Sequence, residues 1–313
     1  MTQRTPDVSV LMPSYNYARY LPSAIEGVIS QSYQDLELII IDDCSSDGSR
    51  EIAAEWSRLD DRVVTVFHDK NRGLSASRNS GLAASLGKYI ALCDADDIWS
   101  AEKLGSQVEC LRNHPEVGAI HSDSLIIDAE GTLTGRRFSS LYHERDQKCF
   151  GVLFKELCLR NFICNSTVVL RRECLKYTEG FDERLRSLED WICWARVARK
   201  YPFYYIGDPL TRYRVHDTSL SMNESAMARN RVTAIRLMLD EFNDIPRRVR
   251  SRMLYSMAMS YWSLGDSRNA LKELIESVEV DPLQCRSWVR CLQILLARPS
   301  DDIPIGDSKA RKQ

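Results

Sequence analysis

Three β-rich runs in the first hundred residues each end abruptly in polar side chains, and this repetition constrains the chain more than any other feature. One run is followed by Pro-Ser-Tyr-Asn at 13–16, the next by two aspartates at 42–43, and another by Asp-Ala-Asp-Asp at 94–97. Open α/β sheets bind ligands in the crevice outside the carboxyl ends of their strands. An acidic pair after one strand is most often a helix cap. Three strands that end in this way favour a ligand site.

Amphipathic stretches alternate with the β-rich runs, which is the pattern of a mostly parallel sheet covered by helices. We expect strands at Val8–Met12, Leu36–Ile41, Val63–Phe67, Tyr89–Cys93, Gly118–His121, Thr167–Leu170 and Phe203–Ile206. The expected helices are Arg19–Gln31, a helix capped by Asp47 and Ser49 that ends at Trp56, Leu74–Leu86 and Asp190–Lys200. The predicted fold class is therefore α/β, with a mixed, mostly parallel sheet flanked by helices.

From about residue 223 onward no β-rich run remains, so we predict one α/β domain over 1–222 and an all-helical region over 223–313 that ends in a flexible tail. The segment 249–282 resembles a single tetratricopeptide repeat, a helix-turn-helix unit of about 34 residues. The matching residues are Ala258, Tyr261, Leu264-Gly265-Asp266, Ala270, Leu274 and Asp281-Pro282. One repeat cannot bury its own face. It must pack on the first domain, on neighbouring helices, on a partner protein or on another copy in an oligomer.

Charge and hydropathy exclude two classes of function. The formal net charge of −2 gives no overall positive field, so nucleic acid is not an expected partner. No apolar run is long enough to cross a bilayer, so we expect no transmembrane segment and a cytoplasmic protein. The basic cluster at 247–252 is interpreted as a solvated helix face, with a weak contact to the inner membrane surface as the alternative.

The ten cysteines carry no paired CxxC spacing, and most lie within apolar runs. Structural zinc requires cysteines and histidines at close spacing, and the five histidines lie far from any cysteine pair. We therefore expect reduced thiols that are mostly buried.

Asp94 and Asp96 alternate in an extended segment, so their carboxylates point to the same side. Magnesium and manganese prefer oxygen ligands, and one or two carboxylates with substrate phosphates suffice to hold them. The pattern predicts a site for Mn²⁺ or Mg²⁺. The alternative is an acidic loop exposed to solvent, because short motifs match often by chance.

The succession of motifs resembles the family-2 inverting glycosyltransferases, which have the A-type glycosyltransferase fold. The matching runs are VSVLMPSYNYARY, IIIDDCSSDGS, NRGLSASRNSG, YIALCDADDIW, LEDWICWARVA and YRVHDTSLS, in the family's order over about residues 6–222. The resemblance implies a nucleoside-diphosphate sugar donor, UDP-linked, and an acceptor hydroxyl on a saccharide or glycolipid. It places the chain in surface polysaccharide or glycolipid assembly.

The resemblance also implies roles for residues around the donor. Pro13 shapes a turn and Tyr15 stacks on the donor base, while Asp43 hydrogen-bonds that base. Arg78 and Asn79 lie near the donor, where an arginine offers hydrogen-bond donors to phosphate or ribose oxygens. The alternative for Arg78 is a surface arginine on a helix.

For the reaction itself, the resemblance makes Asp96 the direct metal ligand and lets Asp94 face the ribose or the metal. His216 reaches the metal or a phosphate oxygen, with an exposed loop histidine as the alternative. Asp190 is the general base; otherwise it is an ordinary acid in the first turn of a helix. Asp97 is expected to cap a following helix, and Cys44 stands where the family usually has glycine.

Three other functions compete with this one. A nicotinamide-dependent dehydrogenase requires a glycine-rich turn after the first strand, where this chain has Pro-Ser-Tyr-Asn. A phospho-acceptor receiver domain is much shorter and carries its acidic pair after the first strand. A catalytically silent relative that binds a partner through the helical region stays open, although the presence of both Asp96 and Asp190 argues against it.

Overall fold

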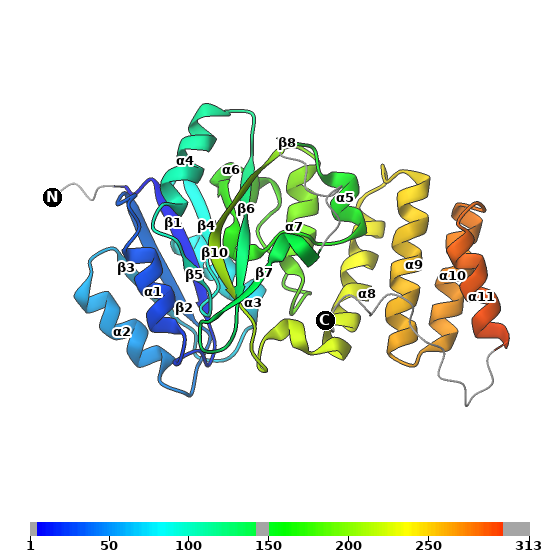
Figure 1. Cartoon of the computed structure of the whole chain (residues 1–313), viewed down its shortest axis with the longest axis horizontal. Coiled ribbons are helices and arrows are strands. Elements are labelled where there is room, and N and C mark those ends of the chain that lie inside the picture. Colours follow the sequence, from blue (N-terminus) through cyan, green and yellow to red (C-terminus); the bar gives the residue numbers. More distant parts are fainter. Residues whose placement is uncertain (1–4, 142–149, 297–313) are drawn as a thin grey trace. The chain divides into compact units, whose positions relative to one another are not determined.

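The computed structural model describes residues 5–141 and 150–296, and it divides into two compact units (Figure 1). The first, called here the sheet unit, comprises Met1–Leu153 and Phe162–Asp217. The second, the helical unit, comprises Phe154–Asn161 and Thr218–Gln313. The flexible tail that we expect after the last helix lies outside the described residues.

The sheet unit contains one mixed sheet with the strand order β3-β2-β1-β4-β9-β6-β10-β5, while β7 pairs with β6 and β8 with β10. The strands are β1 Val8–Ser14, β2 Leu36–Asp42, β3 Val63–Phe67, β4 Tyr89–Leu92, β5 Ile98–Trp99, β6 Ala119–Ile127, β7 Leu133–Arg137, β8 Phe150–Gly151, β9 Val169–Arg171 and β10 Phe203–Arg214. β1 to β4 are mutually parallel where they pair, and β9 is antiparallel to both β4 and β6. The predicted mixed, mostly parallel sheet is confirmed.

Helices cover the sheet and make up the helical unit. They are α1 Leu21–Ile29, α2 Ser49–Leu59, α3 Leu74–Ala84, α4 Lys103–Asn113, α5 Phe154–Leu159, α6 Arg172–Tyr177, α7 Glu189–Ala198, α8 Glu224–Glu241, α9 Arg247–Ser263, α10 Ser267–Val280 and α11 Cys285–Leu296. Short 3₁₀ turns occur at Phe138–Leu141, Asn165–Thr167 and Leu220–Met222. The predicted strands and helices are all present with ends shifted by a few residues, except that β6 and β10 run well beyond their predicted ends.

The central strands β1, β2 and β4 are buried along their whole length, so their side chains form core on both faces of the sheet. α3 lies unusually close to this core because of Gly81. A Cβ atom at that position would stand 2.6 Å from Cδ1 of Ile41, a distance that real side chains do not reach. The absent side chain lets α3 pack closely on Ile41 of β2 and Leu11 of β1.

Two predicted helix caps are wrong. α2 begins after Gly48, whose φ of 95° is left-handed, and Asp47 accepts hydrogen bonds from the backbone and hydroxyl of Ser49 and from the backbone N–H of Ala18. Asp47 therefore ties the loop after β1 to the start of α2. Asp97 precedes the short strand β5, and its Oδ1 accepts from the Arg214 backbone N–H at 2.9 Å. A buried backbone N–H on β10 requires a partner, and Asp97 supplies it.

The helix pair expected at 249–282 is present as α9 and α10. The turn between them contains Gly265 with a φ of 78°, and Asp266 caps α10 by accepting from the Asn269 backbone N–H at 3.0 Å. Ala258 and Leu274 are fully buried between the helices. The assignment to a tetratricopeptide repeat stays a prediction.

The basic cluster at the start of α9 contributes to packing in the helical unit. Arg247 donates through Nε to the Val280 carbonyl and through Nη2 to that of Glu279, so it caps the carboxyl end of α10. Arg250 lies 4.0 Å from Glu276. Two of the four arginines therefore have structural partners. No helix in residues 5–141 and 150–296 is long and apolar enough to span a membrane.

The nine cysteines that the structure describes are all free thiols, and six of them are buried. The expectation that most of the thiols are buried is confirmed for those residues.

Lys103, on α4, is fully buried beneath the strand ends. Its Nζ donates to Gln107 Oε1 at 2.7 Å and lies 4.0 Å from the centre of the Trp99 ring. Burial lowers the pKa of Lys103 to about 7 from an ordinary value of 10.5. The neutral amine is therefore favoured in the folded chain above neutral pH.

This burial predicts a specific pH dependence of stability. Between about pH 7 and 10 the unfolded Lys103 binds more protons than the folded one, so the free energy of unfolding rises as the pH rises and this gain is absent below pH 7. In Lys103→Met the part of this pH dependence that Lys103 causes disappears. Relative to the wild-type chain, the variant is stabilised most at pH 6, by about 1–4 kcal/mol. Urea unfolding of both proteins at pH 6 and 9 measures the difference, and equal pH slopes would contradict the assignment.

Candidate functional site

Tyr15 follows β1 as an exposed aromatic side chain, 47% accessible, while Pro13 is buried within the strand. Asn16 has a left-handed φ of 59°, its N–H donates to the Ser45 hydroxyl at 2.9 Å, and its Oδ1 accepts from the Ser46 N–H at 2.9 Å. The loop after β1 is thereby fixed to the loop after β2. A ring held at the strand end with a free face is suited to stacking on a planar ligand.

Asp43, at the carboxyl end of β2, is buried and holds the loop that leads into α3. Its Oδ1 accepts from the Arg72 N–H at 2.8 Å and its Oδ2 from the Gly73 N–H at 2.7 Å. The His68 ring lies 2.7 Å from Oδ1 through Nδ1 and 2.9 Å from the Ser80 hydroxyl through Nε2. Asp43, the residue predicted to bind the donor base, is thus already held by the Arg72 N–H, the Gly73 N–H and the His68 ring. Of these three contacts, Oδ2 makes only the one with Gly73.

Asp42, the last residue of β2, and Cys44 shape the turn that follows the strand. Asp42 has a structural role, because its Oδ2 accepts from the Ser45 N–H at 3.1 Å. Cys44 adopts a left-handed φ of 65°, a conformation that favours glycine and explains the glycine usual at this position. The strand end keeps its turn despite the cysteine side chain.

Arg78 joins two acidic residues that are far apart in the sequence. From α3 its buried guanidinium donates through Nη2 to Asp94 Oδ1 at 2.9 Å and through Nη1 to Glu189 Oε1. Asp94 follows β4, whereas Glu189 begins α7 directly before Asp190. The arginine is therefore not on the surface, and it connects the carboxyl end of β4 to the first turn of α7.

Asn79, predicted to lie near the donor, contacts the loop before α7. Its side chain donates to the Phe181 carbonyl at 2.9 Å and to Glu183 at 3.0 Å, and it accepts from the Phe181 N–H at 2.8 Å. A Cβ on Gly180, whose φ is 84°, would lie 2.6 Å from Asn79 Oδ1. These bonds fix the loop, and donor binding by Asn79 stays a prediction.

Asp96 and His216 meet directly although 120 residues separate them. The imidazole Nε2 lies 3.0 Å from Asp96 Oδ2, and both side chains are largely buried. The rings of Tyr20 and Tyr17 surround the imidazole, with centroids 4.8 and 6.0 Å away. The two residues predicted to share a metal ion are therefore neighbours in the fold.

Negative charge accumulates at this end of β4. Burial raises the pKa of Asp94, Arg78 opposes the rise, and the Asp96 carboxylate adds to it. Burial, followed by Asp96 and Asp94, raises the pKa of Asp97 well above its usual range. A bound cation would offset this mutual repulsion.

The Asp96–His216 pair fits a divalent ion as part of a coordination shell. In octahedral coordination with ligand distances of about 2.0–2.1 Å, neighbouring ligand atoms lie about 3 Å apart, which is the separation of this pair. Within residues 5–141 and 150–296, no group of three or more His, Cys, Asp or Glu side chains is arranged to hold a metal. A cation here would need oxygens from its substrate and from water, as Mg²⁺ and Mn²⁺ sites commonly do.

Asp190 lies in the first turn of α7, partly buried, with its Oδ1 accepting from the Trp191 N–H at 2.7 Å. Leu188, before the helix, has a left-handed φ of 64°. A leucine in this conformation costs about 1–3 kcal/mol and persists only where its surroundings impose it. Such strain is typical of functional turns.

The sequence did not reveal several residues that support these acids. Asn165 donates to Asp94 Oδ1 at 3.0 Å, and the Ser166 hydroxyl accepts from the Asp94 N–H at 2.9 Å. Arg214 donates through Nε to the Asp96 carbonyl at 2.7 Å. The sequence signal for the first two is a polar Asn-Ser-Thr run before a β-rich segment, and Arg214 lies two residues before His216.

The chain is similar in sequence to known glycosyltransferases. The family model described as "Glycosyl transferase family 2" matches residues 9–177, which is more than half of the chain. TuaG of Bacillus subtilis (strain 168), a glycosyltransferase provisionally assigned to teichuronic acid biosynthesis, is 29% identical over 226 residues, covering 72% of this chain and 85% of TuaG.

Two solved structures share the fold at low sequence identity. Residues 1–349 of S. aureus TarS, in complex with UDP-GlcNAc, give a TM-score of 0.68 at 14% identity, covering 92% of this chain and 89% of that one. The mannosyltransferase PcManGT from Pyrobaculum calidifontis, in complex with GDP-Man and Mn²⁺, gives 0.61 at 19%, covering 95% and 82%. The chain therefore belongs to glycosyl transferase family 2, as a glycosyltransferase with the A-type fold.

Proposed function

We propose that the chain is an inverting glycosyltransferase that moves a sugar from a UDP-linked donor to an acceptor hydroxyl, with Mn²⁺ or Mg²⁺ bound. The observation that carries the proposal is the Arg78 bridge, which connects Asp94 at the end of β4 to Glu189, the neighbour of Asp190. A donor site and a base must be held in fixed relation for a single displacement. A buried arginine bonded to both elements is suited to that task.

In this mechanism Asp190 takes the proton of the acceptor hydroxyl. The hydroxyl oxygen forms a bond to the anomeric carbon as the bond from that carbon to the diphosphate oxygen breaks, and the electron pair leaves with the diphosphate. Attack from the face opposite the leaving group inverts the anomeric centre. Proton transfer to a positioned carboxylate typically contributes a factor of roughly 100 to 10,000 in rate.

The donor nucleotide lies along the strand ends in this proposal. Tyr15 stacks on the base, and the second lone pair of Asp43 Oδ2 accepts an N–H from it. Asp96 and His216 would hold the cation, and a bound cation would neutralise charge on the leaving diphosphate. The ligands of TarS and PcManGT, UDP-GlcNAc and GDP-Man with Mn²⁺, support a nucleotide-sugar donor and a metal.

The biological role that we propose is surface polysaccharide or glycolipid assembly at the cytoplasmic face of the membrane. It is supported by the role assigned to TuaG. A catalytically silent relative that uses the helical unit to bind a partner is the alternative. The strained turn at Leu188, which presents Asp190, favours the enzyme, because a silent protein has no use for that strain.

The general base can be tested with Asp190→Asn. We expect donor binding to stay and turnover to fall by roughly 100- to 10,000-fold, because the amide cannot accept the proton. A panel of nucleotide sugars is first screened for the one that most raises the melting temperature of the protein. Turnover is then measured as UDP release from that nucleotide sugar. Asp240→Asn, an exposed aspartate on α8, is the matched control. Unchanged turnover in Asp190→Asn would remove Asp190 from the mechanism.

The metal assignment predicts a different result for Asp96→Ala. Manganese should strengthen UDP binding to the wild-type chain and to the control Asp61→Ala, an exposed aspartate before β3. In Asp96→Ala this gain should fall by at least about tenfold, because a ligand is lost. Calorimetric titration of UDP with and without manganese measures it. A full manganese effect in Asp96→Ala would show that Asp96 is not a ligand.

The Arg78 bridge predicts separable effects on stability and turnover. Arg78→Met leaves two acids without their partner and should lower the free energy of unfolding by about 3–5 kcal/mol. Arg78→Met combined with Glu189→Met removes the more buried of the two ion pairs and leaves only Asp94 without its partner, so it should recover part of that loss, yet kcat should stay low with UDP affinity kept. Full activity in the double variant would show that the bridge serves stability alone.

A further inference from the structure

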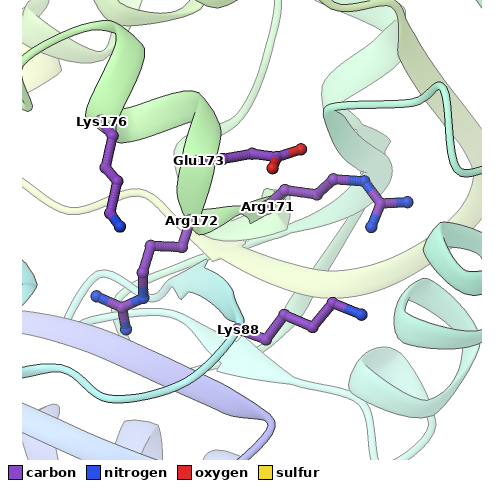
Figure 2. Close-up of a pocket in the computed structure, with 5 residues that line it drawn as sticks. All are labelled: Lys88, Arg171, Arg172, Glu173 and Lys176. Atoms are coloured by element: carbon purple, nitrogen blue, oxygen red, sulfur yellow. The ribbon is translucent and has the colours of Figure 1, made fainter.

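A polar pocket lies at the end of β4 opposite Asp94. It has a volume of about 240 Å³ and is lined by Lys88, Arg171, Arg172, Glu173 and Lys176 (Figure 2). Lys88 directly precedes β4, and the β4–β9 pairing sets Tyr89 opposite Arg171. Asp94 follows the other end of β4. The four residues of that strand alone separate the two sites by roughly 13 Å.

Four cations and one carboxylate line this pocket, so it carries a local excess of positive charge although the whole chain is slightly acidic. Arg171 has a structural role, because its guanidinium donates to the carbonyls of Val117, Leu111 and His114. In Figure 2 the Glu173 carboxylate extends on the side of Arg171. Lys88 extends to that same side, whereas Arg172 and Lys176 extend to the other side of the pocket, away from the carboxylate.

Lys88 and Lys176 are both exposed, and the side chain of neither makes a hydrogen bond or ion pair with another part of the chain that the structure describes. Lys88 contacts the Tyr89 ring at 5.1 Å from its centre. In Figure 2 the side chain of Lys176 extends toward the guanidinium of Arg172. Two cationic groups that approach each other repel unless an anion lies between them.

Arg172 provides an independent sign of a missing partner. Its Nε donates to the Gly87 carbonyl at 2.6 Å, which fixes the side chain against the turn before β4. Its Nη2 is buried and has no hydrogen-bond partner within the described residues. A buried donor on a charged group is costly when it stays unsatisfied, and an anion in the pocket would supply the missing acceptor once the guanidinium turns toward it.

We propose that this pocket binds a phosphate group, held by Arg172 and Lys176 with Lys88 on the opposite wall. An arginine fork matches the geometry of phosphate oxygens, and lysine adds a mobile point charge. The pocket is smaller than the roughly 300–1,000 Å³ of sites for drug-sized ligands, so it fits a single head group and not a whole nucleotide. The phosphate is supplied by a free phosphate ester or ion, or by the head group of an anionic lipid.

The test uses the full chain and a double variant, Lys88→Gln with Lys176→Gln. Both lysines are exposed, so the fold should tolerate the change. The matched control, Lys155→Gln with Lys272→Gln, removes the same charge from exposed sites of the helical unit. One arm titrates inorganic phosphate at constant ionic strength against chloride. The other measures co-sedimentation with phosphatidylglycerol vesicles and with phosphatidylcholine vesicles.

We expect saturable binding by the wild-type chain and the control, weakened at least about tenfold in the Lys88/Lys176 variant. Binding of phosphate itself would identify a free phosphate as the ligand, whereas binding only to phosphatidylglycerol vesicles would identify the lipid head group. Absence of binding in both arms would overturn the proposal. The proposal would also be overturned if the Lys155/Lys272 control bound as weakly as the Lys88/Lys176 variant, or if chloride gave the same response as phosphate. In either case the response would reflect net charge alone. UDP binding should be unchanged in the Lys88/Lys176 variant, which separates this pocket from the donor site.

Discussion

The contact between one arginine and two acids organises the sheet unit. Arg78 reaches Asp94 at the end of β4 and Glu189 at the start of α7, so a single guanidinium ties the central strands to the segment that carries Asp190. Both bonds are largely removed from water, and a buried charge without a partner is costly. The positions of the strand end, α3 and α7 therefore depend on one another.

Around this contact the loops after the strands are fixed to each other and not only to their own strands. The turn after β1 is bonded to the loop after β2 through Asn16 and Asp47, and Asp43 holds the loop that begins α3. Asp96 reaches the segment after β10 through His216. A site assembled from four strand ends gains rigidity from these cross-links, because loops alone are the more mobile parts of a fold. Such rigidity preserves the spacing of charged groups that electrostatic catalysis requires.

The sequence predicted the frame of the molecule well and the partners of its polar residues poorly. The parallel strands were recognisable because buried strands read as continuous apolar runs, and β3 has the ends predicted for it. The short strand β5 escaped detection because two residues carry no periodicity, and this led to the wrong cap for Asp97. The pairing of Asp96 with His216 followed only from a resemblance. The bridge from Arg78 to Glu189 spans 111 residues, and no local pattern encodes so distant a bond.

The glycine at position 81 shows how an absent side chain can govern distant chemistry. Residues 78 and 81 are neighbours on one face of α3, and the missing methyl group lets that face settle onto Ile41 and Leu11. An alanine there would have to displace the Cδ1 atom of Ile41, and any part of the clash that this side chain does not absorb would move the helix and the guanidinium with it. Gly81, which bears no functional group, thus helps to position the Arg78 guanidinium, and the packing of one helix becomes a determinant of reactivity.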